Sequence, residues 1–203
     1  GVPVPPVVGY CEDEAVTGAP FYVMEFVEGP VIRGPEQAAA FPSEEQRRRL
    51  GEGLVETMAK IHSVNVNEVG LSDLGRHDGY VQRQLKRWSG QWEKSKTREL
   101  PLVEDVHSRL VELAPPQSAV TLVHGDYRLG NFMYDETGVQ GIIDWELAHW
   151  GDPMEDIGWL AVKSWRFGGK KPMAGIQDDQ FRKILENNII ANNWLISMVV
   201  PEM

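Results

Sequence analysis

Three polar residues near the middle of the chain have types and spacings that could support chemistry. The stretch "TLVHGDYRLGNFMYDETGVQGIIDWE" places Asp126 after one apolar run, Asn131 at the start of the next, and Asp144 at the end of a third. Residues 131–145 are typical of a β-hairpin whose turn is "DETG". Because the two ends of a hairpin meet, Asn131 and Asp144 are expected to be neighbours, with Asp126 close to both.

This combination of groups suits a metal ion and a phosphate. One carboxylate beside one amide oxygen fits Mg²⁺, which takes few protein ligands and completes its shell with phosphates and water. Asp126 would be a third oxygen group, able to orient a hydroxyl and accept its proton. Phosphoryl transfer requires such a base and such a metal. The alternative is that all three residues are turn and cap residues, a frequent role of Asp and Asn.

Three amphipathic helices are predicted before this stretch, at 42–64, 80–95 and 100–116. Ser43 and Gln46 match a capping box at the start of the first. Each helix has an apolar face that is expected to lie in the core. The faces comprise Leu50, Leu54, Met58 and Ile61 in the first helix, Val81, Leu85, Trp88 and Trp92 in the second, and Leu102, Val106, Leu110 and Leu113 in the third.

Strands are predicted on both sides of these helices. Residues 1–9 are rich in Pro and are expected to be extended, and 21–29 is typical of a buried strand that ends at a turn. Residues 119–126 begin as a strand. The strand at 21–29 needs partners that the remaining sequence hardly supplies. Two further helices are predicted, at 152–165, with Asp152 as N-cap, and at 178–199.

Composition narrows the class of protein. The formal net charge of -10 argues against a nucleic-acid binder with a broad basic surface. No apolar run reaches the length of about 18 residues that a membrane-spanning helix needs. The single cysteine, Cys11, excludes an intramolecular disulfide and suggests a reducing compartment. A cytoplasmic protein without membrane or nucleic-acid partners is therefore expected.

Several segments resemble one known family. "HGDYRLGN" resembles the catalytic loop of the aminoglycoside phosphotransferase and choline kinase group, "IIDWE" its metal-binding segment, and "FYVMEFVEG" the hinge strand between the lobes of a kinase. The resemblance implies an α+β, protein-kinase-like fold that is mostly the helical C-terminal lobe. Residues 1–30 would be a remnant of the N-terminal lobe with the hinge, and 31–203 the helical lobe with the catalytic loop and metal-binding hairpin.

The resemblance also implies roles for individual residues. Asp126 would be the catalytic base, Asn131 and Asp144 would hold Mg²⁺, and Arg128 would neutralise charge on the transferred phosphate. His124 and Asp156 would be structural hydrogen-bonding groups of the loop. The adenine of ATP would be held by Met24, Glu25, Val27, Met133 and Ile143.

The closest resemblance is to phosphotransferases that are associated with acyl-CoA dehydrogenases. It is carried by "GAPFYVMEFVEG", "MAKIHSVNVNEVGLSDLG" and "YVQRQLKRWSGQW" together with the catalytic loop and metal segment. This branch implies an ATP- and Mg²⁺-dependent kinase whose acceptor is a small-molecule alcohol, with hydroxyacyl-CoA thioesters among the substrates. The acidic net charge alone would instead suit a cationic acceptor.

A kinase of this fold also needs a phosphate-pairing lysine from its N-terminal lobe. The first lysine, Lys60, comes after the hinge, so the chain is expected to be a piece of a longer enzyme. Two alternatives are a complete but catalytically incomplete nucleotide-binding module, and a metal-dependent phosphohydrolase. Truncation would expose the edge of the 21–29 strand, through which the chain is expected to self-associate.

Overall fold

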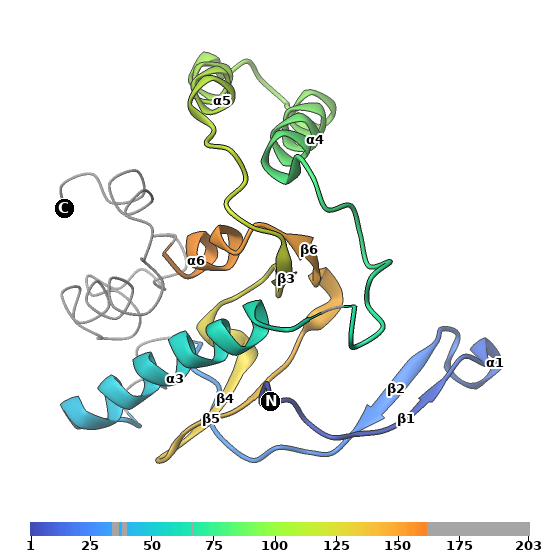
Figure 1. The fold of residues 1–203 in the computed structure, drawn as a ribbon, viewed down its shortest axis with the longest axis vertical. Helices are drawn as coiled ribbons and strands as arrows, with labels where there is room; N and C mark the ends of the chain where they lie inside the picture. The colour runs from blue at the N-terminus through green and yellow to red at the C-terminus, as the bar shows by residue number, and fades with distance from the viewer. Residues whose placement is uncertain (34–36, 38–39, 66, 162–203) are drawn as a thin grey trace.

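The computed structural model describes residues 1–161, except for 34–36, 38–39 and 66. The helix expected at 178–199, and the end of the one expected at 152–165, lie outside the described residues. Figure 1 shows the elements in space. In chain order they are β1 (Val7–Cys11), α1 (Glu14–Thr17), β2 (Phe21–Met24), α3 (Glu44–His62), α4 (Tyr80–Ser95), α5 (Pro101–Leu113), β3 (Thr121–Val123), β4 (Phe132–Asp135), β5 (Gly138–Ile142), β6 (His149–Gly151) and α6 (Met154–Ala161).

The core forms where α3 lies across the β4–β5 hairpin (Figure 1). The apolar face predicted for α3 is confirmed, because its four members are among the most buried side chains: Leu50, Leu54, Met58 and Ile61. The predicted capping box is confirmed too. Ser43 Oγ accepts from the Gln46 backbone N–H, and Gln46 Oε1 accepts from the Ser43 N–H, each at 3.1 Å.

The predicted hairpin is also confirmed. β4 pairs antiparallel with β5, and Phe132 lies opposite Ile142. The Asp135 carboxylate stabilises the turn by accepting the backbone N–H groups of Thr137, at 2.7 Å, and Gly138, at 3.1 Å. At the open end, the Ile143 N–H donates to the Asn131 carbonyl at 2.9 Å, so the two ends of the hairpin meet.

A second small sheet joins the start and the end of this region. β3 pairs antiparallel with β6, a strand that sequence patterns did not predict. Single turns of 3₁₀ helix, Leu129–Asn131 and Trp145–Leu147, lie next to the hairpin ends. α6 follows β6, and its predicted cap is confirmed, since Asp152 Oδ1 accepts the Met154 N–H at 3.0 Å.

The predicted strand at 21–29 is shorter than expected and has a partner within the chain. β2 ends at Met24 and pairs antiparallel with β1. Beyond Met24, the Glu25 N–H still donates to the Pro6 carbonyl at 2.9 Å, but Pro5 and Pro6 have no N–H group to donate in return. This sheet exposes Val7, Val8, Tyr10, Tyr22 and Val23. Self-association through it stays a prediction.

The apolar faces predicted for α4 and α5 are not core in the described part of the chain. The two helices pack against each other and stand apart from α3 (Figure 1). Trp88 is 59% exposed and Leu102 73% exposed, and among the described residues α5 has no buried side chain. The period of the sequence shows that each helix has an apolar stripe, but it does not show what covers that stripe. None of the described helices has the length and apolarity needed to cross a membrane.

Candidate active site

The loop 124–131, between β3 and β4, is anchored from below by one buried carboxylate. Asp156 of α6 has no exposed surface, and it accepts the backbone N–H groups of His124 and Gly125, each at 3.0 Å. His62 Nε2, at the end of α3, lies 2.9 Å from the same carboxylate. The prediction that Asp156 is an acceptor beneath this loop is confirmed. The loop is therefore tied to two helices through a single side chain.

Glycine is required at the second position of the loop. Gly125 has φ 81°, in the left-handed region that residues with a Cβ rarely adopt. A Cβ there would lie 2.6 Å from the Leu147 carbonyl oxygen. The Gly125 carbonyl accepts the indole N–H of Trp159. The backbone is thus held on both sides, immediately before Asp126.

His124 connects the loop to the hairpin. Burial lowers the pKa of this imidazole, which is therefore neutral near pH 7. Its Nε2–H donates to the Ile143 carbonyl at 2.9 Å, and its Nδ1 accepts the Asp126 N–H at 3.2 Å. Both ring nitrogens are used, so the prediction that His124 is a structural hydrogen-bonding group is confirmed. The ring sets the position of Asp126 relative to the residue that precedes Asp144.

The Asp126 carboxylate has two charged or polar neighbours. Arg128 Nε donates to both of its oxygens, at 2.8 and 3.0 Å. The Asn131 amide nitrogen donates to Asp126 Oδ2 at 2.8 Å and to the Asp126 carbonyl at 2.9 Å. Because these bonds occupy the nitrogen side of the amide, the Asn131 oxygen is directed away from Asp126.

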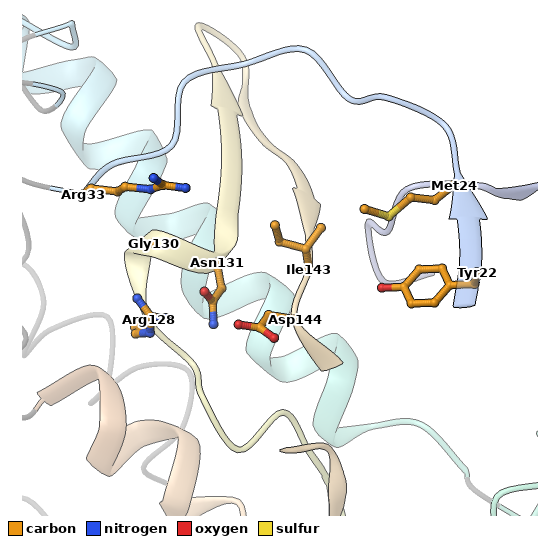
Figure 2. Close-up of a pocket in the computed structure, with 8 residues that line it drawn as sticks. All are labelled: Tyr22, Met24, Arg33, Arg128, Gly130, Asn131, Ile143 and Asp144. Carbon is orange, nitrogen blue, oxygen red and sulfur yellow. The ribbon is translucent and has the colours of Figure 1, made fainter. Parts of the chain in front are cut away.

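Asn131 and Asp144 are neighbours, as the hairpin predicts, and Figure 2 shows the Asp144 carboxylate directed toward the Asn131 side chain. Asp144 has φ 70°, and in the described chain it is the one residue other than Gly with a positive φ. Asp tolerates this conformation better than most residues. The unusual backbone turns the carboxylate toward Asn131 at the end of β5. Left-handed residues of this kind are often found at functional sites.

A cavity of about 560 Å³ opens beside this pair (Figure 2). Its lining comprises Tyr22, Met24, Arg33, Arg128, Gly130, Asn131, Ile143 and Asp144. Four of the predicted metal-binding and catalytic residues are thus brought together, because Asp126 is bonded to two of the lining residues, Arg128 and Asn131.

The predicted adenine-binding residues divide into two groups. Met24 and Ile143 line the cavity. Glu25, Val27 and Met133 are not among the described residues that line it. Met133 is buried, and it and Val27 both lie near Gly141, where an added Cβ would be 2.8 Å from Met133 Cε and 3.8 Å from Val27 Cγ1. The side chains of Val27 and Met133 therefore lie together over Gly141 of β5.

Three lining residues were missed by sequence reasoning. Tyr22 had a signal, since it stands two positions before Met24 and alternate residues of a strand share a face. Gly130 lies inside the quoted loop, and a Cβ there would meet Arg128 Nη1 at 2.8 Å. Arg33 had no signal, because the path of the segment after β2 decides where its side chain lies.

His149 of β6 is expected to make the stability of the fold depend on pH. Its Nε2 lies 3.1 Å from Glu155 Oε2. Burial disfavours the charged ring, but Glu155 and the Leu147 carbonyl outweigh it, so its pKa is raised. A raised pKa stabilises the fold below the ordinary value of 6.5, and this stabilisation is lost as pH rises through the folded value. His149→Gln should therefore lower the free energy of unfolding by roughly 1 kcal/mol more at about pH 5.5 than at about pH 8.

Urea unfolding at the two pH values measures this difference. The buried His124 contributes to the pH dependence of stability with the opposite sign. Its lowered pKa reduces the free energy of unfolding as pH falls below the ordinary histidine pKa of 6.5. For that reason each variant is compared with wild type at the same pH. Glu155→Gln is the matched control and should remove most of the pH dependence of the His149 effect. An equal loss at both pH values would contradict the assignment.

Comparisons of the sequence and of the structure with known proteins agree on one protein family. The phosphotransferase enzyme family, APH, matches residues 1–184. The chain is 31% identical over 186 residues to acyl-CoA dehydrogenase family member 10 of Mus musculus, covering 91% of the chain and 17% of that relative. It therefore spans about a sixth of the length of this relative.

Two solved structures show the same fold. A crystal structure of a Ralstonia eutropha protein, described as an aminoglycoside phosphotransferase, aligns with a TM-score of 0.78 and 34% identity over 92% of this chain and 60% of that one. The streptomycin–ATP ternary complex of APH(2″)-IIa aligns with a TM-score of 0.62 and 22% identity, over 90% of this chain and 58% of that one. The second likeness is one of fold alone.

Proposed function

Because the chain belongs to the phosphotransferase enzyme family and has a protein-kinase-like fold, we propose that it carries the catalytic centre of an ATP- and Mg²⁺-dependent kinase. The acceptor would be a hydroxyl group of a small molecule. One observation carries the proposal: Asn131 and Asp144 are neighbours in a cavity that has apolar side chains, Met24 and Ile143, in its wall. A purine base and a metal-bound triphosphate need these two surfaces next to each other.

The two neighbours fit a magnesium ion. The Asn131 amide nitrogen is occupied by Asp126, so the oxygen is the atom available to a cation. Asp144 adds one carboxylate. Mg²⁺ bound here would take its other ligands from phosphates and water and would neutralise part of the phosphate charge.

The remaining residues supply positioning and proton transfer. In the proposed reaction the acceptor oxygen bonds to the γ-phosphorus, the bond from that phosphorus to the β-phosphate oxygen breaks, and ADP leaves. Asp126 takes the proton of the acceptor hydroxyl. Arg128, bonded to Asp126, would place positive charge beside the transferred phosphoryl group. The N–H groups that Asp156 holds keep the loop in place during this step.

For the acceptor, we propose a hydroxyacyl-CoA thioester rather than an aminoglycoside. The support is the segment-by-segment resemblance to phosphotransferases associated with acyl-CoA dehydrogenases, together with 31% identity to a relative named for that dehydrogenase family. The fold by itself would not choose a substrate, because acceptor pockets vary among proteins of one fold.

The first test is a thermal melt of the chain with ATP, with and without Mg²⁺. A ligand at about 100 times its dissociation constant adds roughly 2.7 kcal/mol to the free energy of unfolding, which corresponds to several degrees. Asp144→Asn should lose the part of the shift that requires Mg²⁺, because a neutral amide binds the cation less strongly. Asn also accepts the left-handed backbone at this position.

Glu136→Gln provides the control for this melt. It removes the same charge from an exposed position of the hairpin turn, away from the cavity, and should leave the Mg²⁺-dependent shift unchanged. A nucleotide shift of equal size without Mg²⁺, or one that persists in Asp144→Asn, would contradict the proposed metal site.

A further inference from the structure

The cavity has a cationic side that the proposed reaction does not use. Figure 2 shows Arg33 and Met24 on opposite sides of the Asn131–Asp144 pair. Met24, Tyr22 and Ile143 make one side largely apolar, whereas Arg33 contributes a guanidinium on the other. Arg33 comes from the segment between β2 and α3. The cavity therefore changes from apolar, through the proposed metal site, to positively charged.

Arg33 differs from the other arginine of the cavity. Arg128 is ion-paired with Asp126 at 2.8 Å. Arg33 is exposed, and with the residues that the structure describes it makes no hydrogen bond or ion pair. Its charge is thus not neutralised by a described neighbour. An exposed arginine that lines a cavity without such a partner is available to a ligand.

The order of these surfaces across the cavity suggests which ligand Arg33 binds. A nucleotide whose base lies on the apolar side reaches Asn131 and Asp144 with its phosphates. The acceptor must approach the far end of the triphosphate, since its oxygen attacks the γ-phosphorus. Arg33 lies on that side of the pair (Figure 2). We propose that Arg33 binds an anionic group of the acceptor, so that the enzyme selects acceptors that carry a phosphate or a carboxylate.

This inference rests on the proposed kinase function and specifies the acceptor. The planar guanidinium matches the oxygens of phosphate and carboxylate, to which it can donate two parallel hydrogen bonds. A polycationic acceptor would meet like charge at the same place. In a hydroxyacyl-CoA thioester the anion would be a CoA phosphate, and in a free hydroxy acid it would be the carboxylate.

Two matched pairs of probes show whether a CoA phosphate or a carboxylate is the anion that is bound. The first pair is hydroxybutyryl-CoA and hydroxybutyryl-pantetheine, which carry the same alcohol with and without the phosphorylated nucleotide of CoA. The second is hydroxybutyrate and its methyl ester. Each probe is titrated calorimetrically into the full chain with saturating Mg²⁺ and ADP, so that no turnover occurs. The preceding titration with Mg²⁺ and ADP reports separately on the nucleotide site.

The anionic member of at least one pair is expected to bind wild type roughly tenfold more tightly than its neutral partner. Arg33→Gln should reduce that ratio to about one by weakening the anionic member alone, and Arg33→Lys should retain part of it. Arg109→Gln is the control: it removes the same charge from an exposed site on α5, outside the cavity, and should behave as wild type. Higher salt should lower the wild-type ratio.

Three results would overturn the inference. One is equal affinity for both members of each pair, and another is a ratio that survives Arg33→Gln. The third is weaker binding of Mg²⁺ and ADP in Arg33→Gln, which would assign Arg33 to the nucleotide. If wild type fails to bind Mg²⁺ and ADP at all, the proposed function fails and the inference fails with it.

Discussion

Asp126→Asn is expected to reduce turnover by roughly a hundredfold to ten-thousandfold, the usual contribution of a general base. The amide has nearly the same shape as the carboxylate but cannot take the proton of the acceptor hydroxyl. One amide oxygen can still accept from Arg128 or from Asn131, which both bond to the native carboxylate. The loop should therefore keep its position while the chemical step slows.

Steady-state kinetics, followed by ADP release with a hydroxyacyl-CoA acceptor, measure this effect. The same variant should retain the Mg²⁺-dependent melting shift with ATP, because Asp126 is not one of the proposed metal ligands. Asp144→Asn is the comparison, since it should lose the shift as well as the turnover. The pair of variants thus separates the base from the metal site.

Two outcomes would count against this assignment. Turnover within about tenfold of wild type would show that Asp126 does not act as the base. Fast release of phosphate without any acceptor alcohol would favour the phosphohydrolase alternative. In that case Asp126 would activate water, and the discrimination between acceptors would have no role.

Much of the candidate site could be predicted from sequence, because it depends on local chain geometry. A hairpin with a polar turn brings its ends together, so the proximity of Asn131 and Asp144 follows from their positions at the hairpin ends. Arg33 could not be found in this way. Its place in the cavity depends on the route that the chain takes from β2 to α3, which no periodicity encodes.

The fold shows the same division between local and distant contacts. The stripe of α3 was predicted and is buried, because the hairpin lies directly against it. The stripes of α4 and α5 have equally clear patterns, yet Leu110 is half exposed and Trp88 more so. β6 is three residues long, too short for an alternating pattern to be recognised. An amphipathic pattern indicates that a face is apolar, whereas burial depends on the rest of the fold.

The largest expected effect on stability comes from Asp156. Its buried carboxylate accepts two backbone N–H groups of the loop and contacts His62. Asp156→Ala would leave these groups buried without a partner, at a cost of about 3–5 kcal/mol in the free energy of unfolding. Because domains are commonly stable by only about 5–15 kcal/mol, this variant should be close to unfolding. Asp156→Asn keeps one acceptor oxygen and should lose roughly half as much.

Urea unfolding of the two variants tests the ranking, with Asp105→Ala as the control. Asp105 is an exposed carboxylate on α5, so its loss should change stability by less than about 0.5 kcal/mol. A loss below about 1 kcal/mol for Asp156→Ala would show that the loop does not depend on this anchor.

A double-mutant cycle of Asp156→Ala with His62→Gln then divides the loss of stability into two parts. One part comes from the contact with His62 of α3, and the other from the backbone N–H groups of the loop. If the N–H groups of His124 and Gly125 dominate, Asp156→Ala should be almost as damaging in the His62→Gln background as in wild type. That result would connect stability to catalysis, because the same two N–H groups lie directly before Asp126. Asp156→Asn would then be expected to slow turnover by weakening the anchor of the loop, and its pH–rate profile should keep the wild-type shape. A shifted profile would show instead that Asp156 takes part in the proton transfer itself.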